Sequence, residues 1–308
     1  MILNSKGVRR ALAAIAASGI SASLSVAQGA KPSSRPHLLD TLPLAVRYME
    51  VFGQRLAYYE DGPRQARTII LLPNLGWDSH SWAHNFPELA QAYHVLAVDL
   101  PGFGRSAKPL LDYKMDTWTD FLAEFMQLRG LERATFVGAV MGGALAVQMA
   151  LDHPKRVDAV VVAASNSGPG PHEGGLTSIP SAPSLAGTRA NLLALFHDSS
   201  LVTDSVVRRR FIFRLQTNDG YAIQRHLADH RVPYTQEELA RIQVPALVVW
   251  CREDRVTPLA WGEQFAAAFP QGRLATLSSC GHLPNLEQPL AFNEVLLDFL
   301  RSLPGRAP

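Results

Sequence analysis

A segment near the middle of the chain, residues 136–146, reads FVGAVMGGALA. An apolar run leads into Gly138, Gly142 follows four positions later, and a helical pattern begins at once. Glycines let two backbones pass closely and permit a tight turn. The segment therefore predicts a strand, a sharp turn and a helix, in the form of the nucleophile elbow G-x-S-x-G.

The central residue of this predicted turn is Val140, where a nucleophile would be Ser, Cys or Asp. An elbow residue normally sits in strained backbone space, and a β-branched side chain is poorly suited to positive φ. We therefore expect either strain at Val140 or a relaxed turn. A third interpretation is an ordinary strand-to-helix turn that never held a nucleophile.

Strand-like and helical patterns alternate along the body of the chain, in which continuous apolar runs are typical of strands buried on both faces of a parallel sheet. Strands are expected at residues 46–51, 54–60, 68–72, 94–99, 134–137, 157–164, 244–250 and 273–277, and helices at 82–90, 117–129 (capped by Thr117), 142–151 and 290–300. Such alternation predicts an α/β fold with a doubly wound, mostly parallel sheet. Its core should comprise residues 46–165 and 244–303.

The alternation stops between residues 166 and 243. Residues 166–187 are rich in Gly, Pro and Ser and predict a mobile loop. Helical patterns follow at 190–196 and 204–215, and Thr235 begins a capping-box pattern for a third helix. We interpret this insertion as a helical lid that buries a substrate and excludes water.

The N-terminus has the features of an export signal. Lys6, Arg9 and Arg10 precede a weakly apolar stretch, and Ser25-Val-Ala27 offers a small-x-small cleavage site. Residues 1–27 are therefore interpreted as a signal peptide, with periplasmic or secreted localisation and possible twin-arginine export. Residues 28–45 are interpreted as a linker. The alternative to a signal peptide at residues 1–27 is a disordered cytosolic extension or a misplaced start.

The net charge of +2 gives no reason to expect nucleic acid as a partner. The body of the chain has no apolar run of the roughly 20 residues that a membrane span needs. We expect a small molecule as the partner, and neither a metal nor an organic cofactor. His197, His226 and His230 do not have a metal-ligand spacing.

Three further motifs occur along the chain, one before the turn at 138–142 and two after it. They are DLPGFGRS at 99–106, REDRVTP at 252–258 and CGHLPNLEQP at 280–289. Together with the turn at 138–142, they resemble the α/β-hydrolase superfamily over residues 46–303. The elbow, the insertion and the Cys-Gly-His sequence are most similar to meta-cleavage-product hydrolases, which cut a carbon–carbon bond next to a carbonyl.

The resemblance implies a set of site residues. Asp254 matches the family's acid and His282 its catalytic histidine, while Val140 stands at the nucleophile position. The backbone N–H groups of Leu75 and Met141 would form the oxyanion hole. The other interpretation is that His282 is a loop histidine and Asp254 a surface ion-pair partner.

Several residues depart from the pattern of the meta-cleavage-product hydrolases. Ala139 and Val140 replace the Asn and Ser of that elbow, Leu283 stands where an aromatic residue often follows the histidine, and residues 73–76 replace the Gly-rich loop. Arg210 falls near the arginine that binds substrate carboxylate in that group. A solvated face of the lid helix is the alternative for Arg210.

Cys251 and Cys280 should lie at the ends of neighbouring strands, either as a disulfide in an oxidising compartment or as two free buried thiols. Ser106, Ser165 and Ser167 are alternative candidates for the nucleophile, but structural loop roles are favoured for all three.

Two functions follow from these residues. The first is an enzyme that uses the Asp254–His282 pair on a small ester, lactone or diketone without a serine nucleophile. The second is a non-catalytic pseudoenzyme that binds an apolar small molecule under the lid. An ordinary serine hydrolase inactivated at position 140 is a third possibility.

Overall fold

The computed structural model describes residues 24–25, 39–169, 184–228 and 234–305. Nearly all of the expected signal peptide, the first part of the linker, most of the expected loop at 166–187 and His230 lie outside these residues. The sheet, its flanking helices and the inserted helices are described.

A nine-stranded sheet runs through the described residues, in the order β1-β9-β8-β7-β6-β4-β5-β3-β2. Only β3 pairs antiparallel with its neighbours β2 and β5; the other pairs are parallel. The strands are β1 Leu24–Ser25, β2 Arg47–Val51, β3 Gln54–Asp61, β4 Thr68–Leu72, β5 His94–Asp99, β6 Ala134–Ala139, β7 Val157–Ala163, β8 Ala246–Cys251 and β9 Gly272–Leu277. The prediction of a mostly parallel α/β sheet is confirmed.

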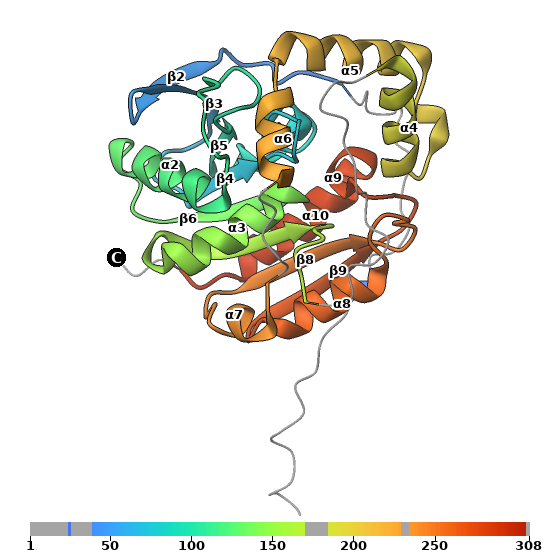
Figure 1. The fold of residues 1–308 in the computed structure, drawn as a ribbon. Helices are drawn as coiled ribbons and strands as arrows, with labels where there is room; N and C mark the ends of the chain where they lie inside the picture. The colour runs from blue at the N-terminus through green and yellow to red at the C-terminus, as the bar shows by residue number, and fades with distance from the viewer. Residues whose placement is uncertain (1–23, 26–38, 170–183, 229–233, 306–308) are drawn as a thin grey trace, which may run out of the picture.

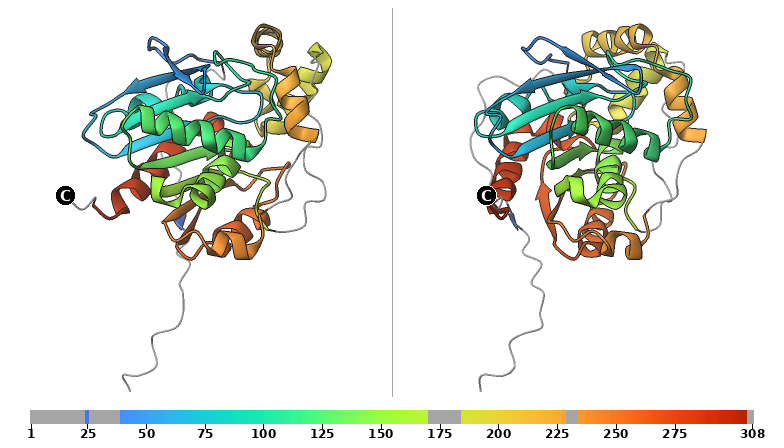
Figure 2. Two further views of the ribbon diagram at one scale, coloured as in Figure 1. Left: turned by 60° about the vertical axis from the view of Figure 1, so that its left-hand side comes forward. Right: turned by 90° about the vertical axis from the view of Figure 1, so that its left-hand side faces the viewer.

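Helices cover both faces of this sheet (Figures 1 and 2). The α-helices are α1 Phe86–Leu89, α2 Met115–Leu128, α3 Met141–Asp152, α4 Leu185–Leu195, α5 Asp204–Thr217, α6 Gly220–Ala228, α7 Gln236–Ala240, α8 Leu259–Ala268, α9 Pro284–Glu287 and α10 Pro289–Ser302, with 3₁₀ helices η1 Ser79–Trp82, η2 Pro154–Arg156 and η3 Ser199–Leu201. One apolar core lies between the sheet and α2, α3 and α8, and a second between the sheet and α1 and α10.

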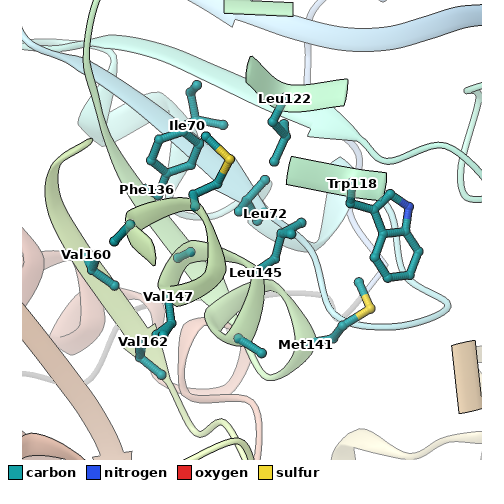
Figure 3. Close-up of a cluster of buried hydrophobic side chains, with 14 of the residues drawn as sticks. Ile70, Leu72, Trp118, Leu122, Phe136, Met141, Leu145, Val147, Val160 and Val162 are labelled. Atoms are coloured by element: carbon teal, nitrogen blue, oxygen red, sulfur yellow. The ribbon is translucent and has the colours of Figure 1, made fainter. Parts of the chain in front are cut away.

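The first core fixes the position of α3. Leu72 and Leu145 point toward each other, and Val147 lies beside Val160 and Val162 of β7 (Figure 3). All five side chains are fully buried. Because α3 begins directly at the turn after β6, this packing also fixes where that turn lies.

The segment between β7 and β8 contains α4, η3, α5, α6 and α7 and no described strand. We refer to α4, α5 and α6 as the inserted helices; in Figure 1, α5 lies along the top edge, and α4 and α6 lie to the right of β2 and β3 and above β8 and β9. The capping box expected at Thr235 is present, since its hydroxyl accepts the N–H of Glu238 and the Glu238 carboxylate accepts the N–H of Thr235.

Three details differ from the sequence expectations. The expected helix at 82–90 is instead η1 followed by α1. Pro87 lies in the first turn of α1, where its missing N–H is tolerated; within a continuous helix it would break the hydrogen-bond ladder. Thr117 is not the N-cap of α2, which begins two residues earlier, after Lys114. Helix α6 was not expected.

Candidate active site

The turn between β6 and α3 has the strained geometry. Val140 has φ 52° and ψ −107°, a region that β-branched residues rarely adopt. Its N–H donates to the Ala163 carbonyl of the neighbouring strand at 2.8 Å. Of the alternatives open from the sequence, the relaxed turn is therefore wrong.

The two glycines of the turn are required by close backbone contacts. A Cβ on Gly138 would lie 2.0 Å from the backbone of Gly142, and a Cβ on Gly142 would lie 2.3 Å from the carbonyl oxygen of Leu72. Both distances are far below van der Waals contact. The chain thus keeps the whole backbone of an elbow around a side chain that has no nucleophilic atom.

Asp254 and His282 form a buried pair. His282 Nδ1 lies 2.9 Å from Asp254 Oδ2, and the two residues are 3% and 6% exposed. Asp254 follows β8 and His282 follows β9, so the parallel pairing of these strands brings the two loops together. The interpretation of Asp254 as a surface ion-pair partner is wrong.

Thr257 completes this pair and was missed at the sequence level. Its hydroxyl donates to Asp254 Oδ2 at 2.6 Å and lies 3.2 Å from His282 Nδ1, while its N–H donates to Asp254 Oδ1 at 3.0 Å. Since the hydroxyl is engaged on the acid side of the imidazole and Thr257 is fully buried, Thr257 is not a substitute nucleophile. The signal was its place three residues after Asp254, within hydrogen-bond reach in a tight turn.

Burial alone would raise the pKa of Asp254. The hydrogen bond and charge of His282, together with the hydrogen bonds of Thr257, outweigh burial and hold this pKa below its usual value. Asp254 is therefore ionised at neutral pH and able to orient and stabilise a protonated His282.

A disulfide joins the two loops. Cys251 ends β8 and Cys280 lies two residues before His282, with their Cα atoms 5.5 Å apart. Of the two states open from the sequence, the structure has the bonded one. The bond fixes the start of the acid loop against the histidine loop.

The histidine loop is also attached to the inserted segment. His282 N–H donates to the Leu195 carbonyl at the end of α4, at 2.7 Å. Glu287 Oε1 accepts the N–H groups of His197 and Asp198, and its Oε2 accepts the N–H of Gly281. Burial raises the pKa of Glu287 despite these three bonds.

The two expected oxyanion donors differ in availability. Met141 is the first residue of α3, and within the described part of the chain no acceptor for its N–H is found, as expected in a first helical turn. The Leu75 N–H instead donates to the side-chain oxygen of the buried Asn74 at 2.6 Å. Leu75 can serve only if Asn74 turns away.

Val140 packs against a cluster of apolar side chains that come from the loop after β4, the inserted segment and the histidine loop. These are Trp77, Leu192, Leu195, Phe196, Val202, Val206, Val207, Leu283 and Leu286. Because Leu283 directly follows His282, the cluster joins Val140 to the histidine loop. The expected nucleophile position thus faces apolar surroundings.

Arg210 is buried, so the solvated-face interpretation is wrong for this residue. Its guanidinium donates to the Gly76 carbonyl at 2.6 Å and stacks 4.0 Å from the ring centroid of Trp77. Burial and the neighbouring Arg214 lower the pKa of Arg210 to about 9. It lines a cavity of about 260 Å³ together with Asp78, Phe213 and the segment that begins at Leu39.

The three serines that are alternative nucleophiles make hydrogen bonds of their own, and Ser165 follows β7, the strand next to β6. Ser106 accepts the N–H of Ala57 and donates to the Asp99 carbonyl, which is a structural loop role. The Ser165 and Ser167 hydroxyls bond to each other at 2.8 Å.

Among the described residues, no group of three or more His, Cys, Asp or Glu side chains could hold a metal ion, and no helix is long and apolar enough to cross a bilayer.

The family model described as alpha/beta hydrolase fold matches residues 67–289, so this chain belongs to the α/β-hydrolase fold family. Within that family it is similar to meta-cleavage product hydrolases. It is 30% identical to 2-hydroxy-6-oxo-6-phenylhexa-2,4-dienoate hydrolase of Burkholderia cepacia, over 77% of this chain and 88% of that protein.

Comparison with solved structures shows the same similarity. The meta-cleavage product hydrolase CumD of Pseudomonas fluorescens IP01, as a serine-to-alanine mutant complexed with acetates, superposes with TM-score 0.75 at 26% identity, covering 84% of this chain and 98% of that one. The enol-lactonase of Burkholderia xenovorans LB400 has TM-score 0.72 at 28% identity, covering 83% and 100% of the two chains.

Proposed function

We propose that this protein is an enzyme that acts on a small carbonyl compound of the ester, lactone or diketone type, with His282 as general base and no covalent intermediate at position 140. The observation that carries the proposal is the 2.9 Å bond between His282 and the buried Asp254, kept next to a turn that lacks its nucleophile. The relatives include a 2-hydroxy-6-oxo-6-phenylhexa-2,4-dienoate hydrolase and an enol-lactonase, whose named substrates carry carbonyl groups, which supports a carbonyl substrate.

In the hydrolytic form of this reaction, His282 Nε2 removes a proton from water as the water oxygen attacks the carbonyl carbon. The resulting oxyanion accepts the N–H of Met141, with that of Leu75 when Asn74 rotates. The tetrahedral intermediate then collapses, and the imidazolium returns the proton to the leaving group. Asp254 stabilises the imidazolium in between.

The inserted helices act as a lid in this proposal, since α4, α5 and the residues between them supply six of the nine buried side chains in the apolar cluster that Val140 packs against. The cavity beside Arg210 would take the polar end of the substrate, with a carboxylate as the group that Arg210 recognises. The Gly76 carbonyl occupies only part of the guanidinium, which has five N–H donors.

The second candidate is a pseudoenzyme that binds an apolar molecule under the lid. The hydrogen bond from Leu75 to Asn74 favours it, because this bond removes one oxyanion donor. Val140 also favours a pseudoenzyme, because its apolar side chain packs against the apolar cluster that includes Trp77 and Leu283.

A substrate screen separates these candidates. Purified wild type, His282→Ala and Asp254→Asn are assayed on p-nitrophenyl esters, enol-lactones and vinylogous 1,5-diketones. Turnover that falls at least about 100-fold in His282→Ala fits a general base. Identical rates in wild type and His282→Ala on every compound would leave only the binding function.

The Val140→Ser variant tests whether this protein is a serine hydrolase that was inactivated by substitution at position 140. If that substitution alone gives reaction with a fluorophosphonate probe and esterase activity, the turn retains a usable nucleophile geometry. Without such a gain, an inactivated serine hydrolase is not supported.

Export is part of the proposal, and the Cys251–Cys280 disulfide supports an oxidising compartment. Cleavage before Gln28 would remove β1, a two-residue strand that pairs with β9 at the edge of the sheet. Mass spectrometry of the protein from a periplasmic fraction should find Gln28 as the N-terminus. An intact Met1 in the cytosolic fraction would contradict export.

A further inference from the structure

Residues 39–42, which lie shortly before β2, are held against the folded core, and we refer to them as the strap. The Leu42 N–H donates to His80 Nδ1 at 3.0 Å, and the Leu42 side chain is buried in the core beside α1 and α10. The Asp40 carboxylate lies 3.2 Å from His84 Nε2. The strap is therefore fixed in position, although it precedes residues 67–289, which the family model matches.

The anchor at His80 is a neutral imidazole. Burial and the neighbouring Arg105 lower the pKa of His80 to about 4, so its Nδ1 is free of a proton at neutral pH and can accept the Leu42 N–H. The other ring nitrogen, Nε2, lies 3.3 Å from the Tyr59 hydroxyl. Both nitrogens of the imidazole thus have partners that fix the ring, and the ring fixes the strap.

The strap also lines the cavity beside Arg210, where residues 39–41 form one wall. The loop after β4 supplies Trp77 to a second wall, and α5 supplies Phe213 to a third. In Figure 1, the blue segment that leads into β2 runs just below α5. The cavity therefore has a wall that comes from neither the loop after β4 nor the inserted helices.

These walls surround a buried cation with apolar side chains. The Arg210 guanidinium lies 4.0 Å from the ring centroid of Trp77 and 5.2 Å from that of Phe213. Leu39 packs against the same apolar cluster as Val140, a cluster that includes Trp77. A molecule whose carboxylate meets Arg210 would therefore place its apolar body beside these rings and Leu39.

We propose that the strap is part of the ligand site, and that Leu39 and Thr41 contact the apolar body of a small carboxylic acid whose charged end is bound by Arg210. This inference rests on the proposed role of Arg210 in substrate binding, but not on catalysis by His282. The cavity holds about 260 Å³, close to the lower limit of roughly 300 Å³ for ordinary ligand pockets, which selects for a small acid.

An introduced thiol tests this contact, with benzoate as the probe. The two cysteines of the chain, Cys251 and Cys280, are bonded to each other and fully buried, so the thiol of Leu39→Cys is the reactive one. Its modification by iodoacetamide is timed on the full chain with and without benzoate. At about ten times the Kd of benzoate, modification should slow about tenfold, because the ligand-free fraction falls by about that factor.

Pro43→Cys is the matched control for labelling, because Pro43 is exposed on the same segment but lies outside the cavity lining. Its modification rate should be the same with and without benzoate. Circular dichroism confirms that each variant is folded, and Thr41→Cys replaces Leu39→Cys if the latter is not.

Calorimetric titration measures the same contact without a label. Leu39→Ala should weaken benzoate binding roughly threefold to tenfold through lost apolar contact. Leu44→Ala is the matched control, since Leu44 is also a partly buried leucine before β2 but packs against the core beside α10. Its Kd for benzoate should equal that of wild type.

The outcomes separate this inference from the proposed enzyme. A thiol on the strap that reacts equally fast with and without bound benzoate overturns the inference, whatever the turnover of wild type. Equal Kd values for wild type and Leu39→Ala overturn it as well, and so does a wild type that does not bind benzoate. Protection of the strap thiol in a protein without turnover supports the inference and contradicts only the enzyme.

Discussion

The strained backbone at Val140 leads us to predict that glycine is more stabilising than alanine at this position, which reverses their usual order inside helices and strands. We compare Val140→Gly with Val140→Ala. Both substitutions remove the branched side chain, but only glycine accepts φ 52° and ψ −107° without strain. At this position glycine should therefore be the more stable of the two.

The magnitude follows from two opposing contributions. A non-glycine residue held in such backbone space costs roughly 1–3 kcal/mol. Glycine loses about 1 kcal/mol relative to alanine through greater freedom in the unfolded chain and one missing methyl group, since Val140 is only partly buried. The net expectation is that Val140→Gly is more stable than Val140→Ala by about 1 kcal/mol.

Val147 provides the matched control, because it is a fully buried valine inside α3 with ordinary helical backbone. There, Val147→Ala should be more stable than Val147→Gly by about 1–2 kcal/mol. Urea unfolding without reductant, followed by the fluorescence of the five tryptophans, measures all four variants. If alanine is the more stable residue at both positions, the strain at Val140 does not exist.

Three further predictions concern the surroundings of this site. Cys251→Ala/Cys280→Ala should lower the free energy of unfolding by about 3.5 kcal/mol, since the bond closes a loop of 29 residues; urea midpoints that match wild type would contradict this. Burial and the neighbouring Asp78 raise the pKa of Asp99 from 3.8 to about 6, against hydrogen bonds from Ser79 and Arg105. The folded state therefore binds this proton more tightly, so the Asp99 contribution should increase stability by about 2.4 kcal/mol as the pH falls from 7 to 4, and Asp99→Asn should remove this component of the urea midpoint's pH dependence. An unchanged slope in Asp99→Asn would count against it. Finally, Gly142→Ala should destabilise by about 3 kcal/mol because its Cβ would meet the Leu72 carbonyl at 2.3 Å, whereas Gly130→Ala, with positive φ but open space, should cost about 1 kcal/mol in thermal unfolding. Equal losses in the two would mean that the turn has room to adjust.

Much of the core follows from local pattern. The strands at 68–72 and 94–99 have the predicted bounds, because runs of consecutive apolar residues survive only where both faces of a sheet are covered. The helix expected at 82–90 shows the limit of the same reasoning. Its apolar positions are buried as expected, but the α-helix begins only at Phe86, with Pro87 in its first turn, and η1 ends at Trp82. The sequence pattern did not show that Pro87 would lie at a helix start.

The sequence identified some residues of the candidate site and missed others. Asp254, His282 and Val140 were placed from motifs whose order matches the topology, since the carboxyl ends of parallel strands meet at one edge of the sheet. Thr257 and Asn74 were not, because their roles depend on where a side-chain oxygen points. No periodicity in a sequence encodes the 2.6 Å contact of Asn74 with Leu75.

By itself, the amino-acid sequence determined the layers of this protein, the order of its motifs and the valine at the centre of the turn after β6, all of which depend on near neighbours in the chain and on burial. Only the tertiary structure decided that Arg210 and Arg214 turn inward, that Cys251 and Cys280 are bonded, and that Val140 keeps positive φ. These outcomes depend on groups far apart in the chain. Their free energies come from burial, ion pairing and close backbone contact, and those exist only once the sheet and the inserted helices are assembled.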